Sequence, residues 1–169
     1  MKERLNYDDM VSSLLVVTAQ TIKGASQTLV NRLPSDQQPK LHKVEFELHC
    51  FLVFALDYWW QTDIAQTQEQ KSCFGETLSS HLGIFWDTEP TGQALIAVEE
   101  RFITYGQIVN EKHEKNDYAA KLFRFSTVLS DHCDIPFIHF SDVVHTLFLT
   151  AMELVHELNP FRNSVSPNQ

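Results

Sequence analysis

The sequence predicts an all-α fold, a single-domain helical bundle of about six helices around a buried central helix at residues 44–60. Apolar residues recur at alternating steps of three and four, which is the spacing of one helix face. No stretch alternates apolar and polar residues as a half-buried strand does. The 5 Gly and 6 Pro mostly separate the apolar blocks, so each block can form an uninterrupted helix.

The length suits one domain, because 169 residues can enclose one hydrophobic core of ordinary size. Residues 1–169 are therefore expected to form one unit, with the polar tail 162–169 frayed at its end. Hydrophobic residues make up 43% of the chain and charged residues 21%, a balance typical of a folded globular protein.

The first helix is expected at residues 7–33, because Pro34 follows it and the residue before a proline disfavours the α conformation. Its apolar face comprises Val11, Leu15, Thr18, Ile22, Ala25 and Leu29. Ser35 and Gln38 have the spacing of a capping box. A second helix is therefore predicted to start there and to run to about Thr67.

Four more helices follow from the same spacing of apolar residues. They are expected at residues 71–86, 93–112, 117–129 and 136–158. The last is predicted to have Asp134 as its N-cap and Pro136 in its first turn. The Asn-Pro pair at residues 159–160 should stop it.

The central segment, VEFELHCFLVFALDYWW, is apolar on nearly every side, as in a helix that is buried all round. It nevertheless carries Glu45, Glu47, His49 and Asp57. Charged groups are rarely buried unless they are paired or bound to something. Either these residues lie where the helix emerges from the core, or the protein has a polar site inside it.

The net charge of −9 and the pI near 5.2 argue against binding to nucleic acid or to anionic lipid, which requires Lys and Arg patches. No run of about 18 apolar residues is present, so no membrane span is expected. The first ten residues lack the pattern of an export signal, and the number of cysteines is odd. We therefore expect a reducing compartment and a cytoplasmic protein.

A metal site inside the bundle is one hypothesis. Helical di-metal proteins use Glu-x-x-His pairs that project inward, and the last helix contains one, Glu153 and His156. Glu45 and His49 share a face of the central helix, and Glu99 lies beside the apolar face of the fourth. These five residues are the candidate ligands for Fe, Mn or Zn. The alternative is surface carboxylates with hydrogen-bonded histidines, because a full site needs a second Glu-x-x-His pair.

Aromatic residues near a carboxylate form a second candidate site. Asp57, Trp59, Trp60 and Trp86 could hold a ligand cation or anchor a partner, although core packing is the favoured interpretation of these residues. His145 lies on nearly the same helix face as His156, but three turns separate them, about 16 Å along the axis, so they cannot share a metal. His145 could instead belong to a partner-binding face.

Catalytic motifs are absent from the sequence: it has no G-x-S-x-G, no H-E-x-x-H and no phosphate-binding glycine loop. The leading hypothesis is a non-enzymatic, cytoplasmic protein with an acidic surface that acts as an adaptor, regulator or neutralising partner. It would bind another protein or form a homodimer, and no cofactor is expected. The alternative is a carboxylate/histidine metalloprotein containing Fe, Mn or Zn, with oxidase or hydrolase activity.

Overall fold

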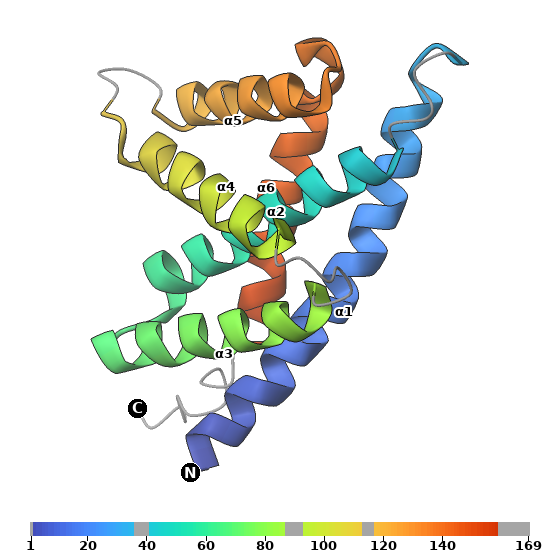
Figure 1. Cartoon of the computed structure of the whole chain (residues 1–169). Coiled ribbons are helices and arrows are strands. Elements are labelled where there is room, and N and C mark those ends of the chain that lie inside the picture. Colours follow the sequence, from blue (N-terminus) through green and yellow to red (C-terminus); the bar gives the residue numbers. More distant parts are fainter. Residues whose placement is uncertain (1, 36–40, 87–92, 113–116, 159–169) are drawn as a thin grey trace.

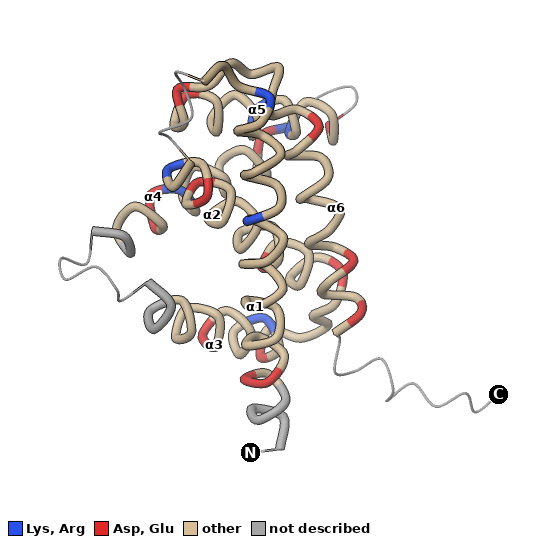
Figure 2. Tube along the Cα trace, turned by 90° about the vertical axis from the view of Figure 1, so that its right-hand side faces the viewer, with Lys and Arg blue, Asp and Glu red and all other residues tan. Residues whose placement is uncertain are grey.

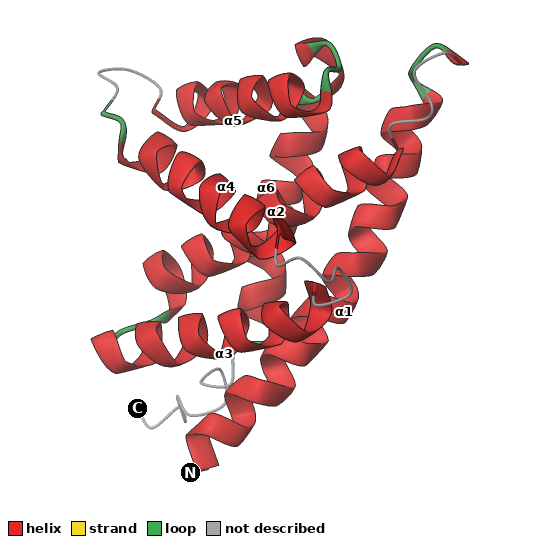
Figure 3. Ribbon diagram, in the orientation of Figure 1, coloured by secondary structure: helices red, strands yellow, loops and turns green. Residues whose placement is uncertain are grey.

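The computed structural model describes residues 2–35, 41–86, 93–112 and 117–158, and only the backbone of residues 2–6, 83–86 and 93–95. These segments form an all-α bundle, as predicted (Figures 1 and 3). Its α-helices are α1 (Lys2–Asn31), α2 (Leu41–Trp59), α3 (Gln68–Trp86), α4 (Gln93–Asn110), α5 (Asp117–Cys133) and α6 (Ser141–Glu157). Two short helices, η2 (Trp60–Ile64) and η3 (Phe137–His139), precede α3 and α6. The predicted frayed tail at 162–169 lies outside the described residues.

The α2 helix is the centre of the bundle. It packs against α1, α4, α5 and α6, while α3 packs mainly on α1 (Figure 1). Every residue from Glu47 to Leu56 is buried, so this stretch meets protein on all its sides, as its apolar composition predicted. The core is rich in aromatic contacts. Phe51, in the middle of α2, lies 5.6 Å from Tyr105 and 5.2 Å from Phe125, measured between ring centroids.

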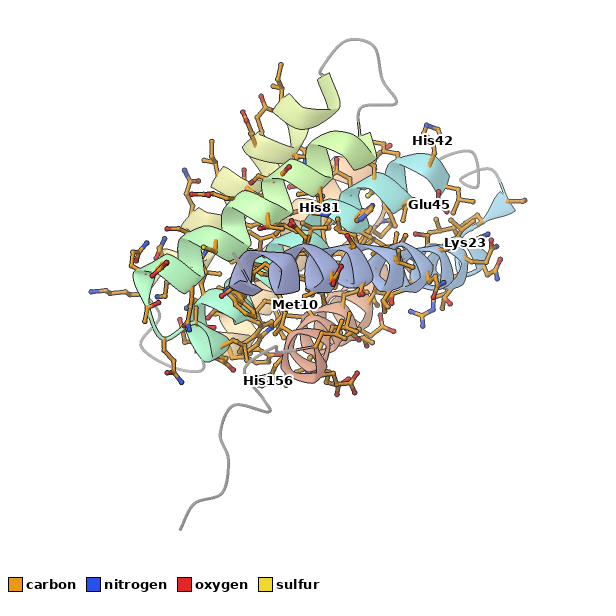
Figure 4. All side chains as sticks on the ribbon, turned by 90° about the horizontal axis from the view of Figure 1, so that it is seen from below. Met10, Lys23, His42, Glu45, His81 and His156 are labelled. Atoms are coloured by element: carbon orange, nitrogen blue, oxygen red, sulfur yellow. The ribbon has the colours of Figure 1, made fainter. Side chains whose placement is uncertain are left out.

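The α1 and α3 helices are joined by a histidine. Nδ1 of His81 lies 2.9 Å from the carbonyl oxygen of Thr77, and its Nε2 lies 3.0 Å from Oγ of Ser12 on α1. Because a carbonyl only accepts hydrogen bonds, Nδ1 carries a proton and donates to Thr77. The hydroxyl of Ser12 is the hydrogen-bond partner of Nε2. Figure 4 shows His81 at this junction of the two helices.

The second predicted helix ends earlier than expected. The α-helix stops at Trp59, and one π-turn follows over Trp60–Ile64, closed by the bond from the Ala65 amide to the Trp60 carbonyl at 2.8 Å. The next helix begins at Gln68 rather than at residue 71. Thr67 and Gln70 explain this start: the Gln70 side chain accepts from the Thr67 amide, and the Thr67 hydroxyl accepts from the Gln70 amide. This is a capping box.

The prediction that Asp134 caps the last helix was wrong. Asp134 has a φ of 54°, the left-handed conformation that commonly follows a helix end. The amide of Ile135 bonds to the carbonyl of Ser130 at 3.2 Å, which is the closing bond of a Schellman motif. Asp134 therefore ends α5, and α6 begins seven residues later at Ser141.

One helical stretch, Phe137–Glu157, has the length and apolarity that a membrane span requires. The core helix of a soluble bundle passes the same test. This stretch contains α6, which packs against α2 and α5 and has Val144, Ala151 and Val155 fully buried.

Replacing Phe51 by Ala should lower the free energy of unfolding by about 3–5 kcal/mol, because the change leaves a cavity in the centre of the core. Phe123→Ala is the matched control, since Phe123 is 58% exposed and should change stability by less than about 0.5 kcal/mol. Urea unfolding of both variants measures the difference. Equal losses would show that α2 is not the centre of the core.

Candidate functional site

The buried charge on α2 is neutralised by α4. Both carboxylate oxygens of Glu47 accept hydrogen bonds from Arg101, from Nε and from one terminal nitrogen, each at 2.7 Å. The Glu47 side chain is 3% exposed and that of Arg101 is 17%. Such a paired, bidentate geometry is the strong form of an ion pair. The hydrogen bonds to Glu47 raise the pKa of Arg101 above its usual value, so this pair fastens α4 to α2.

His49 is the second buried polar group of α2. It is 7% exposed, and burial lowers its pKa to about 4, so the imidazole is neutral at physiological pH. Its side chain forms part of the wall of a pocket of about 370 Å³ between α1 and α2, hereafter the α1–α2 pocket. The wall comprises Ala19, Ile22, Lys23, Glu45, Phe46 and His49.

Figure 4 shows Lys23 on α1 and Glu45 on the neighbouring α2. Sequence reasoning placed Glu45 and His49 on one face, and both do line this pocket. It missed Lys23, because the approach of α1 to this face depends on helix packing and has no signal in the local sequence.

The remaining proposed metal ligands lie elsewhere. Glu153 and His156 are exposed residues of α6, and Nε2 of His156 is 3.4 Å from a carboxylate oxygen of Asp63, which belongs to η2. Glu99 is exposed on α4. Within the described residues, no three side chains of His, Cys, Asp or Glu form a group able to hold a metal ion. The structure therefore does not bring the proposed ligands together.

The two tryptophans whose side chains are described have different surroundings. Trp60 is fully buried and stacks on Phe74 with ring centroids 4.6 Å apart, and its indole N–H donates to the Gln70 carbonyl at 3.2 Å. These contacts make Trp60 a core residue. Trp59 is half-buried and donates to the carbonyl of Phe148 on α6 at 2.9 Å. The side chain of Trp86 lies outside the described residues.

Trp59 lines a small aromatic pocket of about 80 Å³ where α2, α4, α5 and α6 meet. The other rings in its wall are Tyr58, Tyr118, Phe125 and Phe148. The wall also contains Lys121 and Asp117, which form an ion pair at 2.6 Å. The role of Trp59 in ligand binding stays a prediction. His145 is exposed, and its ring contacts Tyr118 at 5.9 Å between centroids.

Asp57 precedes Tyr58 and Trp59 in the chain but does not line this aromatic pocket. One of its carboxylate oxygens accepts from Nε2 of Gln61 at 2.7 Å. The other is buried without a hydrogen bond to any described residue. Burial therefore raises the pKa of Asp57.

An exposed apolar patch lies at the junction of α5 and η3. Phe123 and Phe137 are in ring contact, with centroids 4.8 Å apart, although Phe123 is 58% exposed. Ile138, which follows Phe137 in the chain, is 75% exposed, the highest value among the exposed large apolar residues of the described chain. We call Phe123, Phe137 and Ile138 the α5–η3 patch. Exposed Asp131 and Asp134 lie in the segment between Phe123 and Phe137.

Acidic residues also gather away from this patch. In Figure 2 the N-terminal part of α1 and the C-terminal part of α6 lie toward the same end of the molecule, and both carry Asp and Glu. The exposed ones are Asp8, Asp9, Glu153 and Glu157. A surface of this charge attracts basic molecules over about 8 Å in physiological salt.

Comparison with known proteins does not assign the chain to a family. No protein-family model matches it, and neither the curated proteins nor the solved structures contain a match.

Replacing Arg101 by Ala should lower the free energy of unfolding by about 3–5 kcal/mol, because it leaves the Glu47 carboxylate buried and uncompensated. The matched control is Arg124→Ala. Arg124 pairs with Glu111 at 3.4 Å on the surface, and its loss should cost at most about 1 kcal/mol. Urea unfolding at neutral pH measures both. Similar effects of the two substitutions would contradict a structural role for the buried pair.

His49 should make the protein less stable in mild acid. Between its unfolded pKa of 6.5 and its folded pKa of about 4, the unfolded chain binds a proton that the folded protein does not bind. The free energy of unfolding therefore falls as the pH is lowered through this range, by roughly 3 kcal/mol at most. Urea unfolding at neutral pH and near pH ~4.5 should show a smaller loss in His49→Gln than in the wild type.

The matched control for this pH experiment is His145→Gln, because His145 is exposed. Its loss of stability in acid should equal that of the wild type. If His49→Gln also loses as much stability as the wild type, the imidazole of His49 is not what makes the protein acid-sensitive.

Proposed function

We propose that the protein is a non-enzymatic binding protein whose α5–η3 patch docks a basic protein partner. The observation that carries this proposal is the exposure of Ile138 and Phe123 beside a ring contact with Phe137. Grouped, exposed apolar side chains are typical of protein-binding surfaces, and aromatic residues often dominate their binding energy. An adaptor, regulatory or neutralising role in the cytoplasm fits such a surface.

Charge supports a basic partner over a neutral one. The net charge is −9, and Asp131 and Asp134 are exposed on the segment that leads into η3. An apolar side chain of the partner would pack on the patch. Lys or Arg residues beside it on the partner would be attracted by this negative charge. A second copy of this chain is less suited, because it would bring the same negative charge to the interface.

Site-specific crosslinking should detect this partner. A photoreactive phenylalanine analogue placed at Ile138 should crosslink one basic protein in source cells. The same analogue at Val16 should not do so, although Val16 on α1 is 58% exposed and also apolar. With the analogue moved to Phe123, the additional substitution Ile138→Asp should abolish the crosslink. Raising the salt concentration should weaken it, since surface charge pairs are screened.

Two outcomes would overturn the proposal. A crosslinked species made only of two copies of this chain would identify a homodimer interface in place of a partner site. Equal crosslinking from positions 16 and 138 would show that the patch has no specificity.

A further inference from the structure

Lys23 and Glu45 carry opposite charges and line the α1–α2 pocket, but they do not form an ion pair with each other. Within the part of the chain that the structure describes, neither Lys23 nor Glu45 makes a side-chain hydrogen bond or an ion pair. Both nevertheless line one pocket. A cation and a carboxylate held on two facing helices without contact can bind a ligand that carries both complementary charges.

The other residues of the wall restrict the chemistry and the size of the ligand further. Ile22 and Phe46 give the pocket an apolar surface, and His49 adds a buried imidazole. Since its pKa is about 4, this imidazole adds no positive charge to the wall at physiological pH. The volume of about 370 Å³ lies at the lower end of the range of small-molecule pockets.

We propose that the α1–α2 pocket binds a small zwitterion of the α-amino-acid class that has an apolar side chain. The carboxylate of Glu45 receives the ligand's ammonium group, and the ammonium of Lys23 pairs with its carboxylate. The apolar side chain of the ligand packs on Phe46 and Ile22. This site is separate from the α5–η3 patch, because the described residues of its wall belong to α1 and α2.

A divalent metal fits this pocket less well. Among the described residues of the wall, Glu45 and His49 are the two that could bind a metal ion, whereas protein sites for such ions use three or four ligand side chains. The ammonium of Lys23 in the same wall repels a cation, and it would attract the carboxylate of a zwitterion.

Calorimetric titration with L-leucine and L-phenylalanine tests the proposal, because each carries both charges and an apolar side chain. At least one of them should bind saturably. For L-leucine, isocaproate lacks the ammonium group and isoamylamine lacks the carboxylate, and each should bind about tenfold more weakly, as expected for loss of one charged hydrogen bond.

Variants of Glu45 and Lys23 test which charged group of the ligand each residue binds. Glu45→Gln should weaken L-leucine binding about tenfold and leave isocaproate binding unchanged, because that analogue has no ammonium group. Lys23→Gln should weaken L-leucine binding similarly and leave isoamylamine binding unchanged. Glu153→Gln is the matched control, an exposed carboxylate on α6, and should bind like the wild type.

The proposal fails if neither amino acid binds saturably at millimolar concentration, or if Glu45→Gln and Glu153→Gln bind L-leucine alike. Zinc binding that is lost in Glu45→Gln, without amino-acid binding, would overturn it in favour of a cation site. None of these results depends on the partner crosslink, so the two proposals can fail independently.

Discussion

Complete burial of the middle of α2 is the constraint on which the rest of the fold depends. Burying a charged group on a helix that has no solvent face is costly unless the charge is paired inside the protein. Glu47 therefore requires the guanidinium of Arg101, and this requirement positions α4. The indole of Trp59 finds its acceptor on α6, at Phe148. The positions of α4 and α6 around α2 are thus set by hydrogen bonds to polar groups of α2 as well as by apolar packing.

The helices could be predicted because a helix repeats its faces every 3.6 residues, and the apolar residues follow that period. The start of α3 had a signal too: Thr67 and Gln70 have capping-box spacing. The role of Asp134 was misjudged because an aspartate near a helix boundary suits either an N-cap or the left-handed position after a helix. The π-turn at Trp60 has no such local signature.

Only part of the candidate site could be predicted from the sequence. Glu45 and His49 were placed together because residues four apart share a helix face, and they do line one pocket. Which helix faces them depends on packing between distant segments. For that reason neither Lys23 nor the pairing of Glu47 with Arg101, 54 residues away, could be predicted. The same dependence separates Glu153 and His156 from the α1–α2 pocket.

The order of the helices along the chain has a consequence for synthesis on the ribosome. The most apolar helix, α2, is synthesised before α6, which packs on it and ends at Glu157. At about 5–20 residues per second, on the order of ten seconds pass between the synthesis of α2 and the completion of α6. During that time the apolar surface of α2 is accessible to chaperones and to neighbouring nascent chains. Slow translation after α2 would lengthen this exposure and increase the risk of aggregation.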